Sequence, residues 1–146
     1  MLVRQVEKGL KFYTSGITGF VAVNDVSAAM IALMESDIVN ERFILVGENR
    51  PFRDVMDRIA DKIGKPRPGV YAGLLLSGFA WRMELMKSML TGSKPVITRE
   101  TARSANGKNF YSSEKIKREL KFQFTPVMES IDQTAAIYLS SRKQMV

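Results

Sequence analysis

The sequence predicts one helix-rich α/β unit over residues 1–146, and two neighbouring patterns carry that prediction. Residues 42–46 (RFILV) form a short apolar run followed by glycine, which is typical of a strand buried on both faces in a parallel sheet. Apolar residues then recur on one side of residues 52–63, between Pro51 and Gly64. This spacing predicts an amphipathic helix with proline in its first turn and glycine as its C-terminal cap. With 45% apolar and 25% charged residues, a chain of 146 residues can bury one core.

The residues before this strand predict two helices and two short extended pieces. The first eight residues resemble the end of a helix that Gly9 closes. Residues 10–23 predict two extended pieces about a glycine turn at residues 16–19. Asn24 or Asp25 is then expected to cap a helix that packs one apolar stripe on the core: Val26, Met30, Leu33 and Met34.

The second half of the chain predicts mostly helices. Residues 70–90 are apolar almost all round, which indicates one or two buried helices. Thr98 and Ser112 can each cap a short helix with a glutamate in its first turn. Thr125 and the following proline open a last helix, and the polar residues 140–146 are expected to fray. The apolar stripe of that last helix comprises Met128, Ile131, Ala135 and Tyr138.

The composition excludes several kinds of chemistry. The chain has no cysteine, so disulfides, thiolate nucleophiles and sulfur-ligated metals are excluded, and a cytoplasmic location is expected. It also has no histidine, the commonest general base and metal ligand. No apolar signal region precedes the fold, and the longest apolar stretch (residues 69–81) is shorter than the about 20 residues of a membrane-spanning helix. We therefore expect no membrane association.

The net charge of +7 raises the alternative of a nucleic-acid-binding protein. The densest basic stretch, residues 108–121, also contains Glu114 and Glu119, a mixture typical of the solvated face of a helix. The aspartates within residues 54–61 alternate with arginines in the same way, so we interpret them as a solvated face and not as a metal site. We expect neither a nucleic-acid partner nor a bound metal.

Four stretches follow one another in an order that is similar to a known family. They are residues 16–26 (GITGFVAVNDV), 40–46 (NERFILV) with 59–66 (IADKIGKP), 98–103 (TRETAR) and 111–122 (YSSEKIKRELKF). In this order they resemble the second half of an extended short-chain dehydrogenase/reductase, of the NAD-dependent epimerase/dehydratase and dihydroflavonol-reductase kind. The chain departs from the family pattern at Ala22 and Asn24, which replace an acidic and a basic residue, and at Lys121, where glycine is usual.

The resemblance implies a Rossmann-type parent enzyme that uses NAD or NADP, of which this chain is the C-terminal, substrate-side part without the N-terminal half. The cofactor fingerprint needs a glycine-rich turn between a first strand and its helix, and no G-x-G-x-x-G or G-x-x-G-x-x-G pattern occurs here. The resemblance also places the catalytic tyrosine and lysine of the family upstream of every matched stretch. We therefore assign no catalytic residue to this chain and expect it to bind no cofactor alone.

One tyrosine and lysine do have the catalytic spacing, namely Tyr111 and Lys115. A catalytic pair needs both residues one helical turn apart, so that lysine lowers the pKa of the phenol. Tyr111 precedes the expected cap Ser112, so it should lie outside the helix that holds Lys115, and the resemblance assigns both residues to the C-terminal segment. We interpret the pair as a chance match.

Four residues are candidates for substrate contacts. Arg103 lies where the family places substrate-facing residues, and its N–H donors can bind an anionic group, although such an arginine is also typical of a solvated surface. Tyr13 and Phe20 flank the predicted glycine turn and can line a pocket or belong to the core. Trp81 can wall a cavity or pack within its apolar segment. We interpret Asp25 as an exposed carboxylate near a helix N-terminus, not as a catalytic group.

The sequence thus predicts the substrate-binding and structural part of an NAD(P)-dependent sugar epimerase, dehydratase or reductase, inactive alone, whose partner is a small-molecule substrate. The alternative is a non-enzymatic helical interaction module, because exposed apolar surfaces and strand edges would favour a homodimer. The sequence does not predict the substrate, the reaction type or the choice between NAD and NADP, since a fold resemblance does not fix a reaction.

Overall fold

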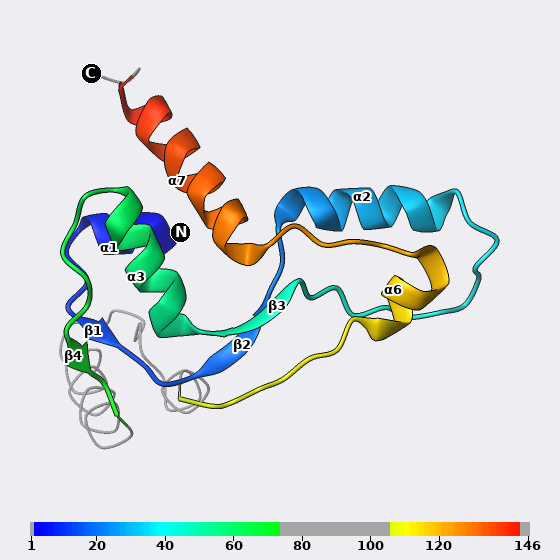
Figure 1. Cartoon of the computed structure of the whole chain (residues 1–146), viewed down its shortest axis with the longest axis horizontal. Helices are drawn as coiled ribbons and strands as arrows, with labels where there is room; N and C mark the ends of the chain where they lie inside the picture. The colour runs from blue at the N-terminus through cyan, green and yellow to red at the C-terminus, as the bar shows by residue number, and fades with distance from the viewer. Residues whose placement is uncertain (1, 74–105, 144–146) are drawn as a thin grey trace, which may run out of the picture.

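The computed structural model describes residues 2–73 and 106–143. Its elements in chain order are α1 (Leu2–Glu7), β1 (Phe12–Tyr13), β2 (Ile17–Phe20), α2 (Val23–Met34), β3 (Glu48–Pro51), α3 (Phe52–Lys62), β4 (Val70–Tyr71), α6 (Glu114–Leu120) and α7 (Val127–Lys143). Figure 1 shows an elongated arrangement, with α1 and α3 at one end and α2 and α6 at the other. The helices predicted within residues 74–90 and at Thr98 lie outside the described residues.

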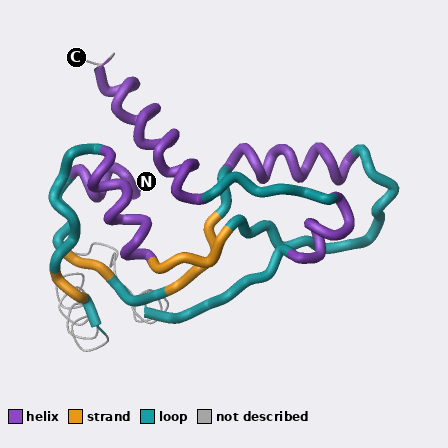
Figure 2. The backbone as a smooth tube through the Cα atoms, in the orientation of Figure 1, coloured by secondary structure: helices purple, strands orange, loops and turns teal. Residues whose placement is uncertain are grey.

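The described strands form two small sheets, drawn in orange in Figure 2. β1 pairs in parallel with β4 and places Tyr13 opposite Tyr71, whereas β2 pairs antiparallel with β3. A further segment joins β2 at one bridge, because the N–H of Ile17 donates to Gly107 at 3.0 Å and its carbonyl accepts from Asn109 at 2.9 Å. The mixed α/β character predicted from the sequence is confirmed.

The predicted strand over residues 42–46 is wrong. These residues form a loop, and strand β3 begins at Glu48, two positions after the predicted strand ends. Helix α6 accounts for the difference, because Ser113 Oγ donates to the carbonyl of Val46 at 2.7 Å and Lys115 Nζ donates to that of Arg42 at 3.3 Å. Side chains of α6 therefore occupy carbonyls that a neighbouring strand would need, and only Val46 of the apolar run is buried.

The glycine turn predicted at residues 16–19 lies elsewhere. The two extended pieces are confirmed as β1 and β2, but residues 14–16 connect them, and Gly19 lies inside β2. A Cβ atom on Gly19 would stand 2.7 Å from Cγ2 of Val46 and 3.2 Å from Cδ2 of Tyr111. Glycine at this position therefore allows β2 to lie directly against the loop before β3 and the segment before α6.

The main core lies between α1, α3 and α7. α1 contributes Val6, and α3 contributes its predicted apolar face, of which Val55 and Ile59 are each 3% exposed. Ile131 and Tyr138 of α7 pack against this core, in agreement with the stripe predicted for the last helix. The remaining members of the cluster are Val3, Ala60, Leu2, Leu10, Phe20 and Ile63.

Helix α2 forms as predicted, but two details of its prediction are wrong. The helix begins at Val23, so Asn24 and Asp25 lie inside it and neither is the capping residue. The residue before the helix, Ala22, makes no side-chain cap. Only part of the predicted stripe is packed: Val26 and Leu33 are partly buried, whereas Met30 is 58% and Met34 is 83% exposed. The fully buried residues of α2 are Asp25 and Ala29. None of the described helices and strands covers Met30 and Met34.

Two carboxylates hold the start of α7. Asp25 accepts hydrogen bonds from the backbone N–H and the hydroxyl of Thr125, both at 2.8 Å. Glu48 accepts from the backbone N–H of Val127 at 3.0 Å and, with its other oxygen, from Arg50 Nε at 2.6 Å. Asp25 is therefore not the exposed carboxylate predicted from the sequence: it is 8% exposed and joins α2 to α7, as Glu48 joins β3 to α7.

Left-handed backbone at the helix ends agrees with the predicted glycine caps. Gly9, with φ 83°, follows α1, and Gly64, with φ 66°, follows α3. Lys121 follows α6 with φ 49°, a conformation that favours glycine, so the glycine of the family pattern has a backbone reason. At the start of α6, Ser113 directly precedes the helix, and the hydroxyl of the predicted cap Ser112 accepts a hydrogen bond from the backbone N–H of Glu114 at 3.3 Å.

Replacement of Gly19 by alanine is expected to lower the free energy of unfolding by about 1 to 3 kcal/mol, because the new methyl group would overlap Val46 and the surrounding residues would have to shift. Gly69→Ala is the matched control, since no atom lies within 4 Å of a Cβ built at that position. Urea unfolding of both variants measures the difference. Equal stabilities would mean that β2 does not pack closely on Val46.

Glu48 should make the fold sensitive to acid. The hydrogen bond from Val127 N–H, with a further contribution from Arg50, lowers the pKa of the Glu48 carboxyl against the opposing effect of burial. A carboxyl with a lowered folded pKa stabilises the fold above its unfolded pKa, about 4.3, and this stabilisation is lost as the pH falls through the folded pKa. Glu48→Gln is expected to lower the free energy of unfolding by about 1 to 2 kcal/mol at neutral pH.

The deficit of Glu48→Gln should shrink as the pH falls through the lowered folded pKa, because the wild-type carboxyl then also becomes neutral. Urea unfolding at neutral pH and at a second, acidic pH below the unfolded pKa of about 4.3 measures this change. Glu35→Gln, at an exposed position directly after α2, removes the same charge and serves as the control. A deficit that stays constant between the two pH values would contradict the role of the charged carboxylate.

Candidate functional site

A group of aromatic and polar side chains lies on the parallel pair β1–β4. Tyr13 and Tyr71 are direct partners in the register, so their side chains project on the same side of the sheet. Their ring centroids are 5.6 Å apart, with an interplanar angle of 42°. Ser15 and Arg53 contact these tyrosines, and Asn106 contacts Ser15. We call these five residues the tyrosine–arginine cluster.

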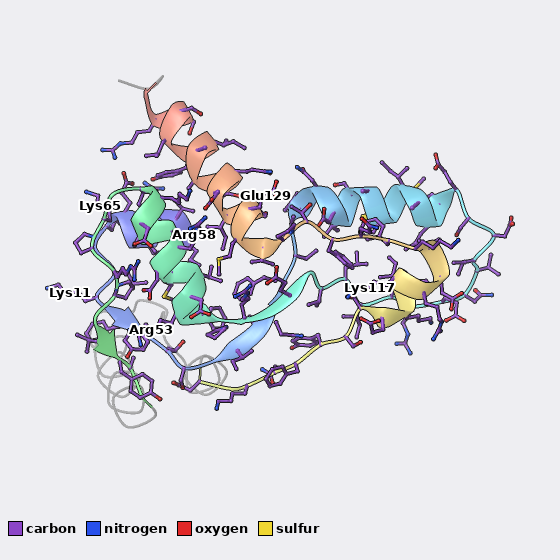
Figure 3. The ribbon with its side chains drawn as sticks, viewed as in Figure 1. Lys11, Arg53, Arg58, Lys65, Lys117 and Glu129 are labelled. Atoms are coloured by element: carbon purple, nitrogen blue, oxygen red, sulfur yellow. The ribbon has the colours of Figure 1, made fainter. Side chains whose placement is uncertain are left out.

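Arg53, labelled in Figure 3, lies in the first turn of α3, which brings it over the ring of Tyr13. The guanidinium carbon lies 4.3 Å from the ring centroid, and Nη1 donates a hydrogen bond to the Tyr13 hydroxyl at 3.3 Å. Nε lies 3.6 Å from a carboxylate oxygen of Asp57, one turn further along the helix. A cation–π contact at such an exposed position contributes about 0.5 to 1 kcal/mol, so Arg53 is oriented but still accessible.

Ser15 connects the two sides of the cluster. Its Oγ donates to Oδ1 of Asn106 at 3.4 Å and lies 3.0 Å from the hydroxyl oxygen of Tyr71. Because a serine hydroxyl has a single proton, the Tyr71 hydroxyl donates to Ser15 when Ser15 donates to Asn106. Tyr71 and Asn106 stand in the sequence on either side of residues 74–105, so one serine joins both flanks of that stretch.

The tyrosine–arginine cluster offers groups that are suited to binding a small molecule. Two phenol rings provide faces for stacking, and their hydroxyls, with the amide of Asn106, provide hydrogen-bonding positions. Arg53 keeps N–H donors beyond the one that it directs at Tyr13, and these can bind a carboxylate or another anionic group. The arrangement therefore favours a ligand that combines a ring with an anionic substituent.

The candidate residues from the sequence have different positions. Tyr13 belongs to the tyrosine–arginine cluster. Phe20 packs edge to face against Phe52, with ring centroids 5.7 Å apart, and against the main core. Trp81 and Arg103 lie outside the described residues. The substrate role of all four residues stays a prediction.

Tyr111 and Lys115 have separate partners. Tyr111 lies in the segment before α6, as the sequence predicts, and its backbone exchanges hydrogen bonds of 2.9 and 2.8 Å with the side chain of Asn49. Lys115 lies within α6, where its Nζ is 2.5 Å from a carboxylate oxygen of Glu41 and 4.8 Å from the ring centroid of Phe43. The ammonium group thus interacts with the loop before β3.

Two of the three carboxylates of α3 pair with arginines. Beyond the contact of Asp57 with Arg53, Asp61 accepts two hydrogen bonds of 2.7 Å from Arg67, and these bonds lower the pKa of the Asp61 carboxyl. Within residues 2–73 and 106–143, no grouping of three or more His, Cys, Asp or Glu could hold a metal ion. A search of the same residues finds no helix with the length and apolar character needed to span a membrane.

The helix N-termini among the described residues lack the turn that holds the pyrophosphate of NAD or NADP. Such a group requires a glycine-rich turn at the N-terminus of a helix, where backbone N–H groups can approach it. Instead, Ala22 precedes α2, Pro51 precedes α3, Ser113 precedes α6 and Pro126 precedes α7. We therefore derive no reaction step through a cofactor in this chain.

The fold recurs within larger chains of solved structures, one of which carries NADP(H). No protein-family model and no curated protein matches the sequence. The chain is similar to gox2253, with a TM-score of 0.73 and 23% identity over 97% of this chain and 43% of that one. It is also similar to the Citrobacter sp. triphenylmethane reductase complexed with NADP(H), with a TM-score of 0.59 and 19% identity over 90% of this chain and 46% of that one.

A second structure of the Citrobacter reductase gives a TM-score of 0.58 at 19% identity, over 92% of this chain and 47% of that one. At these identities the similarity establishes the fold alone. The chain spans less than half the length of each of these proteins.

Most of the cluster was not predicted from the sequence. Among its members the sequence singles out only Tyr13, and Arg53 directly precedes the aspartates that the sequence assigns to a solvated face. Ser15, Tyr71 and Asn106 carry no motif, and they meet because β1 and β4, far apart in the chain, are parallel neighbours. One signal could have indicated Tyr71: an aromatic residue in a short strand directly after a proline- and glycine-rich linker.

Proposed function

We propose that this chain is the C-terminal, substrate-binding and structural part of an NAD(P)-dependent extended short-chain dehydrogenase/reductase that acts as an epimerase, dehydratase or reductase. The observation that carries the proposal is a fold that matches 90% of this chain but 46% of a reductase complexed with NADP(H). The rest of such an enzyme would supply the cofactor site and the groups for hydride transfer. Alone, the chain is inactive.

The sequence supports the same assignment independently. The four stretches between residues 16 and 122 follow the order of the C-terminal half of that family, and the glycine-rich cofactor turn is missing from the sequence. The left-handed backbone at Lys121 gives a physical reason for the glycine that the family has there. The absence of cysteine supports a cytoplasmic location as part of the proposal.

Within this proposal, the tyrosine–arginine cluster contacts the substrate. Tyr13 offers a ring face and a hydroxyl, and Arg53, fixed over that ring, offers a charge. Arg103 would add a second cation, while Phe20 and Trp81 would form apolar walls. The substrate is accordingly a small molecule with a ring and an anionic group.

A second candidate function is self-association without catalysis. The exposed apolar face of α2 favours it, because several large side chains there lack cover among the described elements: Val23, Met30, Ile31 and Met34. A second copy of the chain could bury this face, as could the remaining part of a longer enzyme. Light scattering over a range of concentrations separates the two, because only self-association raises the mass of the isolated chain.

Calorimetric titration of the 146-residue chain with NAD(H) and NADP(H) tests the assignment of the cofactor site. We expect no tight binding of either cofactor, because the glycine-rich turn that would approach the pyrophosphate is missing. The solution mass, measured on the same samples, shows whether a dimer accounts for any heat. Tight binding of either cofactor would overturn the proposal and return Tyr111 and Lys115 to consideration as a working pair.

Benzoate is a direct probe of the cluster, because it combines a ring with a carboxylate. NMR titration is expected to detect its binding, and Arg53→Gln should weaken it about tenfold or more through the loss of charge-assisted hydrogen bonds. Arg118→Gln, whose side chain is 75% exposed on α6, removes the same charge elsewhere and should change the affinity little. No binding, or an equal loss in both variants, would remove the cluster as the substrate contact.

A further inference from the structure

A basic groove lies at the opposite end of the molecule from α6. It is bordered by α1, by the loop after α3 that contains Lys65, and by the second half of α7. Its volume is about 850 Å³, within the range of small-molecule sites. In Figure 3, Lys65 marks this end and Lys117 the other. The groove is lined by Arg4, Glu7, Lys8, Lys65, Tyr138, Ser141 and Arg142.

Helical spacing brings these side chains together. Tyr138 and Arg142 are four residues apart on α7, so they share one face of that helix. Lys8 directly follows α1, and its backbone N–H donates to the carbonyl of Arg4 at 3.2 Å, which continues the helical turn and brings the two residues to the same side. Lys65 comes from a third segment, the loop that begins after the glycine at the end of α3. Basic groups from three separate elements therefore border one concave surface.

The single carboxylate of the groove is already engaged. Glu7 accepts a hydrogen bond from the Tyr138 hydroxyl at 2.5 Å with one oxygen and pairs with Arg142 through the other. The Tyr138 hydrogen bond and the neighbouring cations lower the pKa of the Glu7 carboxyl. Among the described residues, no salt bridge engages Arg4, Lys8 or Lys65.

We propose that this groove binds a small ligand that carries two or more phosphate groups. Four cations and one carboxylate leave three positive charges around a confined volume, and a single anionic group would neutralise only part of them. The planar donors of Arg4 suit phosphate oxygens, and the lysines supply charge. This binding uses none of the residues of the tyrosine–arginine cluster. NAD(H) and NADP(H) also carry a pyrophosphate, so weak binding of either cofactor that is lost in Lys8→Gln/Lys65→Gln belongs to this groove and not to a glycine-rich cofactor turn.

The test uses pyrophosphate and ATP, each titrated calorimetrically into the 146-residue chain at low and at about 0.15 M ionic strength. We expect both to bind, more weakly at the higher ionic strength. The variant Lys8→Gln/Lys65→Gln should weaken the binding about tenfold or more. The control Lys11→Gln/Lys117→Gln has the same net charge but leaves the groove intact, and its affinity should stay within about twofold of wild type.

Three results would overturn the proposal. The first is no binding of either ligand at low ionic strength. The second is an equal loss of affinity in both double variants, which would indicate a response to net charge alone. The third is binding of a random DNA duplex that depends on Lys8 and Lys65 while pyrophosphate and ATP do not bind, which would make the groove a nucleic-acid surface. Circular dichroism of the variants establishes that each is folded.

Discussion

The attachment of α7 by Asp25 and Glu48 is the constraint on which the rest of the molecule depends. The two carboxylates come from α2 and β3, and both accept hydrogen bonds at the first turn of α7 or just before it. Hydrogen bonds from backbone N–H groups to charged carboxylates are strong and directional, so they fix both the position and the direction of the helix start. Because α7 then supplies Ile131 to the core and Tyr138 to both the core and the basic groove, a small rotation at its start would displace both features.

Helix α3 contacts the core with one face and the tyrosine–arginine cluster with another. Its inner face carries the buried residues of the core, while Arg53 in the first turn extends over Tyr13. On a third side, Arg58 binds Asp132 of α7 through two hydrogen bonds of 2.7 and 2.6 Å, and Lys62 lies 2.8 Å from the same carboxylate. The helix that positions the candidate site is thus held by apolar packing and by an ionic contact at once.

Local patterns in the sequence predicted α3, its glycine cap and the stripe of α7, because neighbouring residues determine such features. They failed where a distant partner decides the outcome. Residues 42–46 have the composition of a buried strand, but Ser113 and Lys115 of α6 bind their carbonyls. The stripe of α2 has helical spacing, yet spacing alone cannot say whether another element covers Met30 and Met34. The cluster was missed for the same reason, since the pairing of β1 with β4 is invisible to local periodicity.

The hydrogen bonds of Ser15 have a consequence for how this architecture can diversify. Ser15 holds Tyr71 and Asn106 close together, although 34 residues separate them in the sequence. The entropy cost of closing a chain between two fixed points grows slowly with the number of residues between them. Related sequences can therefore differ in length between Tyr71 and Asn106 while the contacts of Ser15 stay the same.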